Sequence, residues 1–414
     1  MNKIYVFFAS SICNMGGQEQ YLKNKTRRLF AEGFEVYLFS FREGRVLLDE
    51  LQQFKKYVNP VLRLEPYLYK ATDVEKCLNW IEGVVKPCSG DNIYVESNVA
   101  PQAEWGELFA QRVGGRHIII DLQEVHNYAT GLKTFLKYKY GRRELFGITK
   151  KSISLILGSE YNDERAMSSF IHAECGGAIQ EIEHPIVDKF RVKDINIGSL
   201  GRLDKSYVIP MIKDIVEFAK GHDNKSIGLL LIGGGSKEIV KTIQNEIAKS
   251  KNISLFITGF LYPIPGKLIK KIDCFICTAG SAYATMRYGV PTVVYSMSSY
   301  KPLGIFDYTI KDISVEDSEE HPDMQYLLQA VLLEHFCENH PPLGLRERKR
   351  DYQEEFYRQI SFFNSDSDCQ YYDVSKVIAH GIKVRLYKLI SFVVGARLFE
   401  KIQRTLGMAK KNIY

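Results

Sequence analysis

Short apolar runs alternate with amphipathic segments from the start of the chain. Runs of this length that are rich in β-branched and aromatic residues predict strands, whereas an apolar residue at every third or fourth position predicts a helix. Residues 17–33 have the helical spacing, with Tyr21, Leu22, Leu29 and Phe30 on one side. Predicted strands cover residues 3–9, 35–39, 92–96, 117–122 and 153–157.

The same alternation starts again after residues 184–188. Predicted strands cover residues 195–200, 227–232, 253–258, 273–277 and 291–295, and predicted helices cover 209–218, 239–248, 268–272 and 282–288. Strands that alternate with helices are typical of parallel βαβ units. We therefore predict the α/β class, with two doubly wound Rossmann-like domains.

The composition changes at the charge run of residues 346–350, after which helical segments dominate. We predict an N-terminal domain over residues 1–190, a second domain over 191–345, and a helical extension over 346–414. One possibility is that this helical extension packs back onto the N-terminal domain. A chain of 414 residues is too long for one core, so two domains are also the expectation from length.

Charge, cysteines and hydropathy narrow the classes of protein. The net charge of +6 is mild, and no nucleic-acid-binding motif is present, so we expect no nucleic-acid partner. The eight cysteines show no disulfide framework, and Cys274 and Cys277 lie in a predicted buried strand, where we expect packing rather than metal or redox chemistry. Residues 1–9 are typical of a first strand and not of a signal peptide, and no apolar run has the length of a membrane span. We expect a cytoplasmic protein, with the inner face of the plasma membrane as an alternative place.

Two segments in the second half carry the candidate chemistry. The strand 195–200 ends at Gly201 and is followed by Arg202 and Lys205; the strand 273–277 runs into Gly280-Ser281-Ala282 and a helix. Ligands of open α/β sheets bind outside the carboxyl ends of the strands, and a helix N-terminus attracts anions. The pattern indicates a site for a diphosphate.

These motifs resemble those of GT-B glycosyltransferases, closest to the retaining, nucleotide-sugar-dependent enzymes of bacterial polysaccharide synthesis. The resemblance rests on residues 15–22, on residues 30–36, and on the order of motifs from Gly198 to Pro291. It implies a GT-B fold with C-terminal helices. It also implies transfer of a sugar from a nucleotide diphosphate sugar to a saccharide or lipid-linked saccharide, as in capsule or O-antigen synthesis. No cofactor is implied beyond the donor, and no Asp-x-Asp motif indicates a metal.

The resemblance assigns roles by position. Donor phosphate contacts fall on Gly16 and Gly17, on Arg202 and Lys205, and on Gly280, Ser281 and Ala282. Nucleotide contacts fall on Gly233, Gly234, Phe260 and Leu261, and the candidate catalytic residues after the strand 117–122 are Glu124 and His126. Each position also has a non-functional interpretation. The glycines would form tight turns, the cations would be solvated, Phe260 would pack in the core, and Glu124 and His126 would lie in a solvated loop.

One departure from the family keeps two alternatives open. The family carries two glutamates eight positions apart near the second phosphate turn, and the second place is taken here by Ala284. The first alternative is therefore a catalytically inactive partner or scaffold protein. The second alternative is a nucleotide-sugar epimerase, which shares the fold.

Two segments combine basic and aromatic residues, 133–143 and 383–411. One interpretation of this pattern is peripheral contact with an anionic membrane. Solvated charges, or C-terminal helices packed on the first domain, explain the same pattern. Both readings stay open from the sequence.

Overall fold

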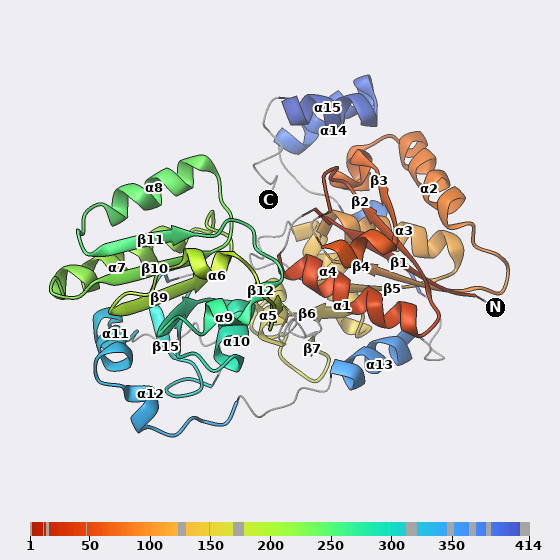
Figure 1. The fold of residues 1–414 in the computed structure, drawn as a ribbon. Helices are drawn as coiled ribbons and strands as arrows, with labels where there is room; N and C mark the ends of the chain where they lie inside the picture. Colours follow the sequence, from red (N-terminus) through yellow and green to blue (C-terminus); the bar gives the residue numbers. More distant parts are fainter. Residues whose placement is uncertain are drawn as a thin grey trace. The chain divides into compact units, whose positions relative to one another are not determined.

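The computed structural model describes residues 2–10, 12–13, 16–46, 48–98, 100–122, 130–148, 150–168, 178–297, 299–311, 321–345, 352–363, 370–377 and 382–405. The chain divides into two compact units (Figure 1). The first unit comprises Met1–His172 together with Asp351–Tyr414, and the second comprises Ala173–Arg350. The second unit is therefore an insertion into the first.

A parallel sheet with the strand order β3-β2-β1-β4-β5-β6-β7 forms the centre of the first unit. Its strands are β1 (Lys3–Ala9), β2 (Glu35–Ser40), β3 (Lys55–Val58), β4 (Asn92–Ser97), β5 (Arg116–Asp121), β6 (Leu145–Gly147) and β7 (Met167–Ser168). The helices between them are α1 (Gly17–Ala31), α2 (Ala71–Val85), α3 (Ala100–Val113), α4 (Thr130–Gly141) and α5 (Lys150–Leu157), with single 3-10 turns at Asp49–Gln53, Pro60–Arg63 and Pro66–Leu68.

Strand β1 shows how both faces of this sheet are covered. Ile4, Val6 and Phe8 belong to a core shared with α2, α3 and the C-terminal residues Tyr387 and Phe399. Tyr5 points to the opposite face, where its ring centroid lies 5.7 Å from that of Phe363. A strand buried on both faces has to be apolar throughout, which explains the continuous run of residues 4–9.

The strand predicted over residues 153–157 is wrong, because these residues end α5. Ile153, Ile156 and Leu157 are buried, whereas Leu155 is 54% exposed. Burial at i, i+3 and i+4 is the helical period, although serine and apolar residues alternate at the start of this segment.

The C-terminal segments complete the first unit. They form α13 (Tyr352–Phe363), a 3-10 turn at Val374–Lys376, α14 (Ile382–Val394) and α15 (Ala396–Thr405). Gln359 of α13 accepts a hydrogen bond from the fully buried ammonium of Lys25 at 2.6 Å, and Lys25 also forms an ion pair with the buried Glu96. Burial lowers the pKa of Lys25, and Glu96 opposes this shift by stabilising the charged form. The C-terminal chain thus supplies part of a buried polar cluster.

The second unit contains a sheet with the order β11-β10-β9-β13-β14-β15. Its strands are β9 (Ile195–Leu200), β10 (Ile227–Ile232), β11 (Ile253–Ile257), β13 (Cys274–Cys277), β14 (Thr292–Tyr295) and the antiparallel β15 (Pro302–Ile305). A separate pair joins β8 (Ile179–Gln180) to β12 (Ile264–Pro265). The helices are α6 (Ile186–Lys189), α7 (Val208–Gly221), α8 (Lys237–Ile247), α9 (Gly266–Ile269), α10 (Ala279–Arg287), α11 (Met324–Leu332) and α12 (Phe336–Asn339).

Helices cover both faces of this second sheet. Leu229 and Leu231 of β10 pack with α7, α8 and α11, while Leu230 and Ile232 pack with α9 and α10. Alternate residues of one strand thus face two different layers, which defines a doubly wound sheet. None of the helices in the described part of the chain combines the length and apolarity that a bilayer crossing requires.

Candidate functional site

The strand order of the second unit defines one position for a ligand. The chain leaves β9 toward β10 and β11 on one side of the sheet, and toward β13 and β14 on the other. At such a switch point the loops after the two central strands diverge and leave a crevice at their carboxyl ends. Cys274 and Phe275 of β13 pair with Ile197 and Gly198 of β9, so the ends of these two strands are neighbours.

Gly201 and Arg202 follow the first of these strands. Gly201 has φ 152°, a conformation that favours glycine, and its amide donates to the Ile232 carbonyl at 3.0 Å. Arg202 is exposed, and no carboxylate among the described residues pairs with its guanidinium. Lys205 is half-buried, with its ammonium 3.9 Å from the Met297 sulfur. Arg202 has no carboxylate partner among the described residues, so its guanidinium at the switch point is suited to an external anion.

Helix α10 begins at the end of the second central strand, β13. Its first residue, Ala279, has φ 46°, which is rare for a residue with a Cβ. The amides of Ser281 and Ala282 already donate to the Thr278 carbonyl, at 3.2 and 3.3 Å. The amides of Ala279 and Gly280 have no such partner among the described residues. Because Ala279 has a left-handed backbone conformation and the next residues are right-handed, successive N–H groups turn to the same side.

Space is available beside this helix start. A Cβ built on Gly280 would meet no atom within 4 Å. Ser281 donates its hydroxyl to the Thr278 carbonyl at 2.6 Å, and Ala282 is fully buried against the core. Of the three predicted residues, Gly280 offers an amide and Ser281 shapes the turn, while the Ala282 side chain packs inside. The strained Ala279 is a site feature that the sequence did not reveal.

The glycine triplet 233–235 has a packing role. A Cβ on Gly233 would collide with the Gly201 carbonyl, one on Gly234 with the ring of Phe260, and one on Gly235 with Ile239 and Leu203. The loops after β9 and β10 therefore lie against each other, and the Leu203 amide donates to the Gly234 carbonyl at 2.9 Å. This close approach fixes the backbone that carries Arg202.

Phe260 follows β11 at the same edge of the sheet. Its ring lies over Gly234 and is 59% exposed, so its packing is one-sided. Leu261 packs partly into the core on the α9 and α10 side. An exposed aromatic face at the carboxyl edge of the sheet is suited to stacking on a nucleobase.

In the first unit, Gly16 and Gly17 lie at the start of α1. The Gly16 amide donates to the Glu19 carboxylate at 3.1 Å, and this carboxylate is buried. A Cβ on Gly17 would meet nothing within 4 Å. Since the Glu19 carboxyl group already accepts the Gly16 amide at the helix start, a phosphate contact at Gly16 stays a prediction. Glu124 and His126 lie outside the described residues, just after Asp121 and Leu122.

A buried cluster of Ser97, His117 and Glu107 resembles a catalytic triad in its spacing alone. His117 Nδ1 lies 2.7 Å from Glu107, and Nε2 lies 3.0 Å from the Ser97 hydroxyl. Burial would raise the pKa of Glu107, but Lys139 and His117 lower it to about 2. All three side chains are fully enclosed, so no substrate reaches Ser97, and Glu107 instead accepts the Tyr372 amide at 2.7 Å.

The cysteine pair of β13 is enclosed in the core, as predicted. Cys274 and Cys277 are both fully buried. Burial raises the pKa of the Cys277 thiol to about 12 and raises that of Cys274 as well. Thiols in this state are poor metal ligands and poor nucleophiles. No group of three or more His, Cys, Asp or Glu in the described ranges is arranged to hold a metal ion.

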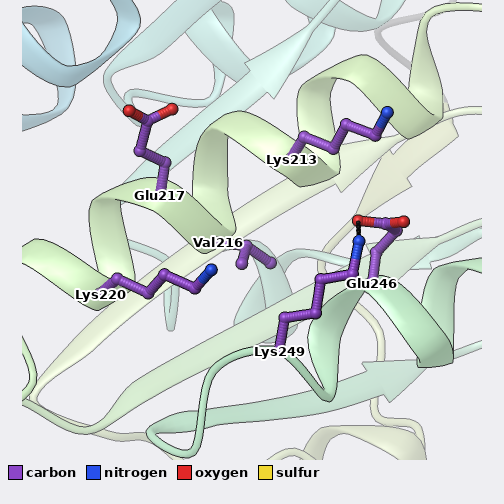
Figure 2. Close-up of a pocket in the computed structure, with 6 residues that line it drawn as sticks. All are labelled: Lys213, Val216, Glu217, Lys220, Glu246 and Lys249. Atoms are coloured by element: carbon purple, nitrogen blue, oxygen red, sulfur yellow. Dashed lines mark hydrogen bonds and ion pairs between the residues drawn. The ribbon is translucent and has the colours of Figure 1, made fainter.

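A hollow of about 400 Å³ is lined by residues of α7 and of the C-terminal end of α8. Figure 2 shows these lining residues. The lining includes three lysines and two glutamates, and Lys249 pairs with Glu246 at 2.6 Å. Lys220 lies at the C-terminal end of α7 and Lys249 just beyond the end of α8, and both helices return the chain to the amino edge of the parallel strands. This hollow is therefore not at the edge that carries Arg202 and α10. The lining residues are Lys213, Val216, Glu217, Lys220, Glu246 and Lys249.

Comparison with known proteins places the fold. No family model matches the sequence, and no curated protein is significantly similar to it. Among solved structures, Staphylococcus aureus TarM in complex with UDP superimposes with a TM-score of 0.58 at 10% identity, over 88% of this chain and 100% of that one. A trehalose-phosphate synthase from Burkholderia vietnamiensis gives 0.56 at 11% identity, over 92% and 100%. A UDP-GlcNAc 2-epimerase from Neisseria meningitidis bound to UDP-GlcNAc gives 0.50 at 14% identity, over 87% and 99%.

These similarities confirm the predicted fold class. The chain has the GT-B fold, with two Rossmann-like domains, and resembles GT-B glycosyltransferases in architecture. Transferases and epimerases both occur among the similar structures. At these identities the likeness concerns the fold.

Proposed function

We propose that the protein is a glycosyltransferase that moves a sugar from a nucleotide diphosphate sugar to a saccharide or lipid-linked saccharide in bacterial surface polysaccharide synthesis. The observation that carries the proposal is that Arg202 and the start of α10 follow the carboxyl ends of two paired strands at the switch point. Arg202 presents a positive charge and the start of α10 presents backbone N–H groups, both at the carboxyl ends of adjacent strands. This is the chemistry that a diphosphate needs.

The proposed mechanism assigns the diphosphate to the second unit. As the bond between sugar and diphosphate breaks, negative charge grows on the leaving group. The guanidinium of Arg202 and the amides of Ala279 and Gly280 would stabilise that charge more in the transition state than in the ground state. Lys205 would add a second cation, and Phe260 would stack on the base. Glu124 and His126 are proposed to act on the sugar or the acceptor, and a retaining outcome is part of the proposal.

The nucleotide is proposed to be a uridine diphosphate. This choice is supported by the UDP in the TarM complex and the UDP-GlcNAc in the epimerase complex. Calorimetry of the full chain with UDP, GDP, ADP and dTDP tests it. UDP should bind, and Arg202→Ala should weaken binding at least about tenfold, or about 1.4 kcal/mol.

A matched control separates the role of Arg202 from general charge. Arg191 is an exposed arginine before the amino end of β9, so Arg191→Ala removes the same charge at the opposite edge of the sheet. It should leave UDP affinity unchanged. Equal losses in the two variants, or no binding of any nucleotide, would contradict the proposed diphosphate site.

The epimerase alternative is distinguished by products. Incubation of UDP-GlcNAc with the protein, with and without an oligosaccharide acceptor, is followed by chromatography of sugars and nucleotides. A transferase releases UDP and lengthens the acceptor, whereas an epimerase converts the donor sugar without needing an acceptor. Binding of UDP without any product would favour the inactive partner protein that Ala284 suggests.

A further inference from the structure

The two C-terminal helices of the first unit differ sharply between their two faces. Val384, Tyr387 and Ser391 of α14 are buried against the unit. On the opposite face Leu386, Leu389 and Val393 are 51%, 63% and 76% exposed. Their spacing at i, i+3 and i+7 makes one continuous stripe on the helix.

Two further apolar residues are exposed on α14 and on α15, the helix that contacts it. Phe392 of α14 is 39% exposed, and Leu398 of α15 is 50% exposed. Large aliphatic side chains that gather on one surface, instead of being scattered singly, mark a surface that another molecule covers. We call the exposed face of these two helices the α14–α15 surface. Its apolar members are Leu386, Leu389, Phe392, Val393 and Leu398.

The exposed charged residues of these two helices have one sign. The exposed ionised residues of α14 and α15 include Arg385, Lys388, Arg397 and Lys401. The acidic residue of these helices, Glu400, is buried and pairs with Arg63 at 3.4 Å. The described part of this surface therefore combines aliphatic side chains with cations and presents no exposed carboxylate.

We propose that the α14–α15 surface docks on an anionic lipid bilayer, with its leucines and valine in the headgroup boundary and its cations against the lipid phosphates. Helices that lie in the membrane interface carry this combination of an apolar face and basic flanks. A second copy of the chain is a poorer occupant, since it would bring two sets of like charges together. The inference deepens the proposed function, because a lipid-linked acceptor lies at such a bilayer.

The other basic segment, 133–143, exposes Lys137 and Arg143 but buries much of its apolar side. Phe135 and Tyr140 of α4 are buried in the core. Lys139 is buried as well and forms ion pairs with Glu107 and Glu144. The proposal therefore concerns the α14–α15 surface, where the apolar side chains are exposed.

Co-sedimentation of the full chain with vesicles tests the proposal in the absence of donor and acceptor. Vesicles of phosphatidylcholine alone are compared with vesicles of equal parts phosphatidylcholine and phosphatidylglycerol. The protein should sediment with the anionic vesicles, and high salt should release it. Leu389→Gln with Val393→Gln should abolish binding. Arg385→Gln with Lys388→Gln should weaken it about 25-fold, since each cation contributes about 1 kcal/mol, or about fivefold.

Controls change the same residue types elsewhere. Leu155→Gln with Val192→Gln removes two exposed aliphatic side chains, and Lys213→Gln with Lys220→Gln removes two cations of α7. Both should bind like the natural chain, and thermal unfolding should confirm that every variant is folded. Equal binding to neutral vesicles, no binding at all, or equal losses in the controls would overturn the proposal.

Light scattering separates lipid docking from self-association. The proposal would also be overturned if the natural chain is a dimer and the double substitution Leu389→Gln with Val393→Gln makes it a monomer. A second copy of the chain would then be the molecule that covers this surface. UDP affinity is measured separately on the same variants. Failure of the vesicle experiment with intact UDP binding contradicts the docking surface alone, whereas loss of UDP binding in Arg202→Ala leaves it untouched.

Discussion

The carbonyl oxygen of Gly201 occupies the space that a Cβ at Gly233 would need. Gly233 also has φ 154°, and its neighbour Ile232 accepts the Gly201 amide at 3.0 Å. Two loops that follow different strands are thereby held in backbone contact. The position of Arg202, the residue after Gly201, depends on this contact.

Gly233→Ala should destabilise the protein because neither backbone can yield without breaking the loop pairing. A collision with backbone together with an unfavourable φ should cost about 1–3 kcal/mol of unfolding free energy. Urea denaturation followed by circular dichroism measures it. Gly17→Ala is the control, since its Cβ would meet no atom. An unchanged midpoint in Gly233→Ala would contradict the close packing of these loops.

Gly280→Val should behave in the opposite way. The Cβ at this position meets nothing within 4 Å, so the folded state should keep its thermal stability. The added side chain would stand beside the amides proposed to receive the diphosphate, so UDP affinity should fall at least about tenfold, or about 1.4 kcal/mol. Calorimetry beside a thermal unfolding curve checks both. Natural affinity in a folded variant would remove the α10 turn from the proposed site.

Lys25→Met should leave the buried carboxylate of Glu96 without its ion-pair partner. Removing one partner of a buried pair typically costs about 3–5 kcal/mol, whereas an exposed pair contributes about 1 kcal/mol or less. The exposed pair of Lys55 and Glu35 supplies the control, so Lys55→Met should change stability little. In Lys25→Met with Glu96→Gln much of the loss should be recovered. Equal effects of the two single substitutions in urea denaturation would argue against a tightly enclosed pair.

The stability of the first unit should fall as the pH rises from about 4.5 to about 7. Burial raises the pKa of Glu65 from 4.5 to about 7, and burial beside Glu65 raises the pKa of Glu104. The folded state then holds protons that the unfolded chain has already released, so the stabilisation is complete below the unfolded pKa and disappears as the pH passes the folded one.

Glu104→Gln should flatten this dependence by up to about 1.4 kcal/mol per pH unit, which corresponds to one proton. Urea denaturation across this pH range measures the slope. Glu43→Gln, an exposed glutamate, serves as the control. A slope that is unchanged in Glu104→Gln would show that the buried acids are not the cause.

The sequence predicts strands best where the whole strand is buried. The predicted run 227–232 coincides with β10, because both faces of that strand are covered and its residues are almost all aliphatic. The strand prediction over residues 153–157, which form the end of α5, failed because this segment is short and only partly apolar. Alternation of serine with apolar residues over a few positions does not separate a period of two from a period of 3.6, and only the burial of Ile153, Ile156 and Leu157 does.

The candidate site was predictable where it rests on local pattern. Arg202 and Gly280 stand at strand ends that the apolar runs already mark. The conformation of Ala279 was not predictable, because alanine carries no signal for a positive φ. The role of Gly233 depends on Gly201, a residue more than thirty positions away, and contacts of that kind arise only when the strand order is known.

The insertion of the second unit into the first has a consequence for synthesis on the ribosome. Residues 173–350 form a continuous piece, whereas Lys25 needs Gln359 and Glu107 needs the amide of Tyr372. Domains generally fold as units while the chain emerges. The piece made later is therefore able to finish folding first, and the first unit must wait for Gln359 and Tyr372 until the last part of the chain arrives.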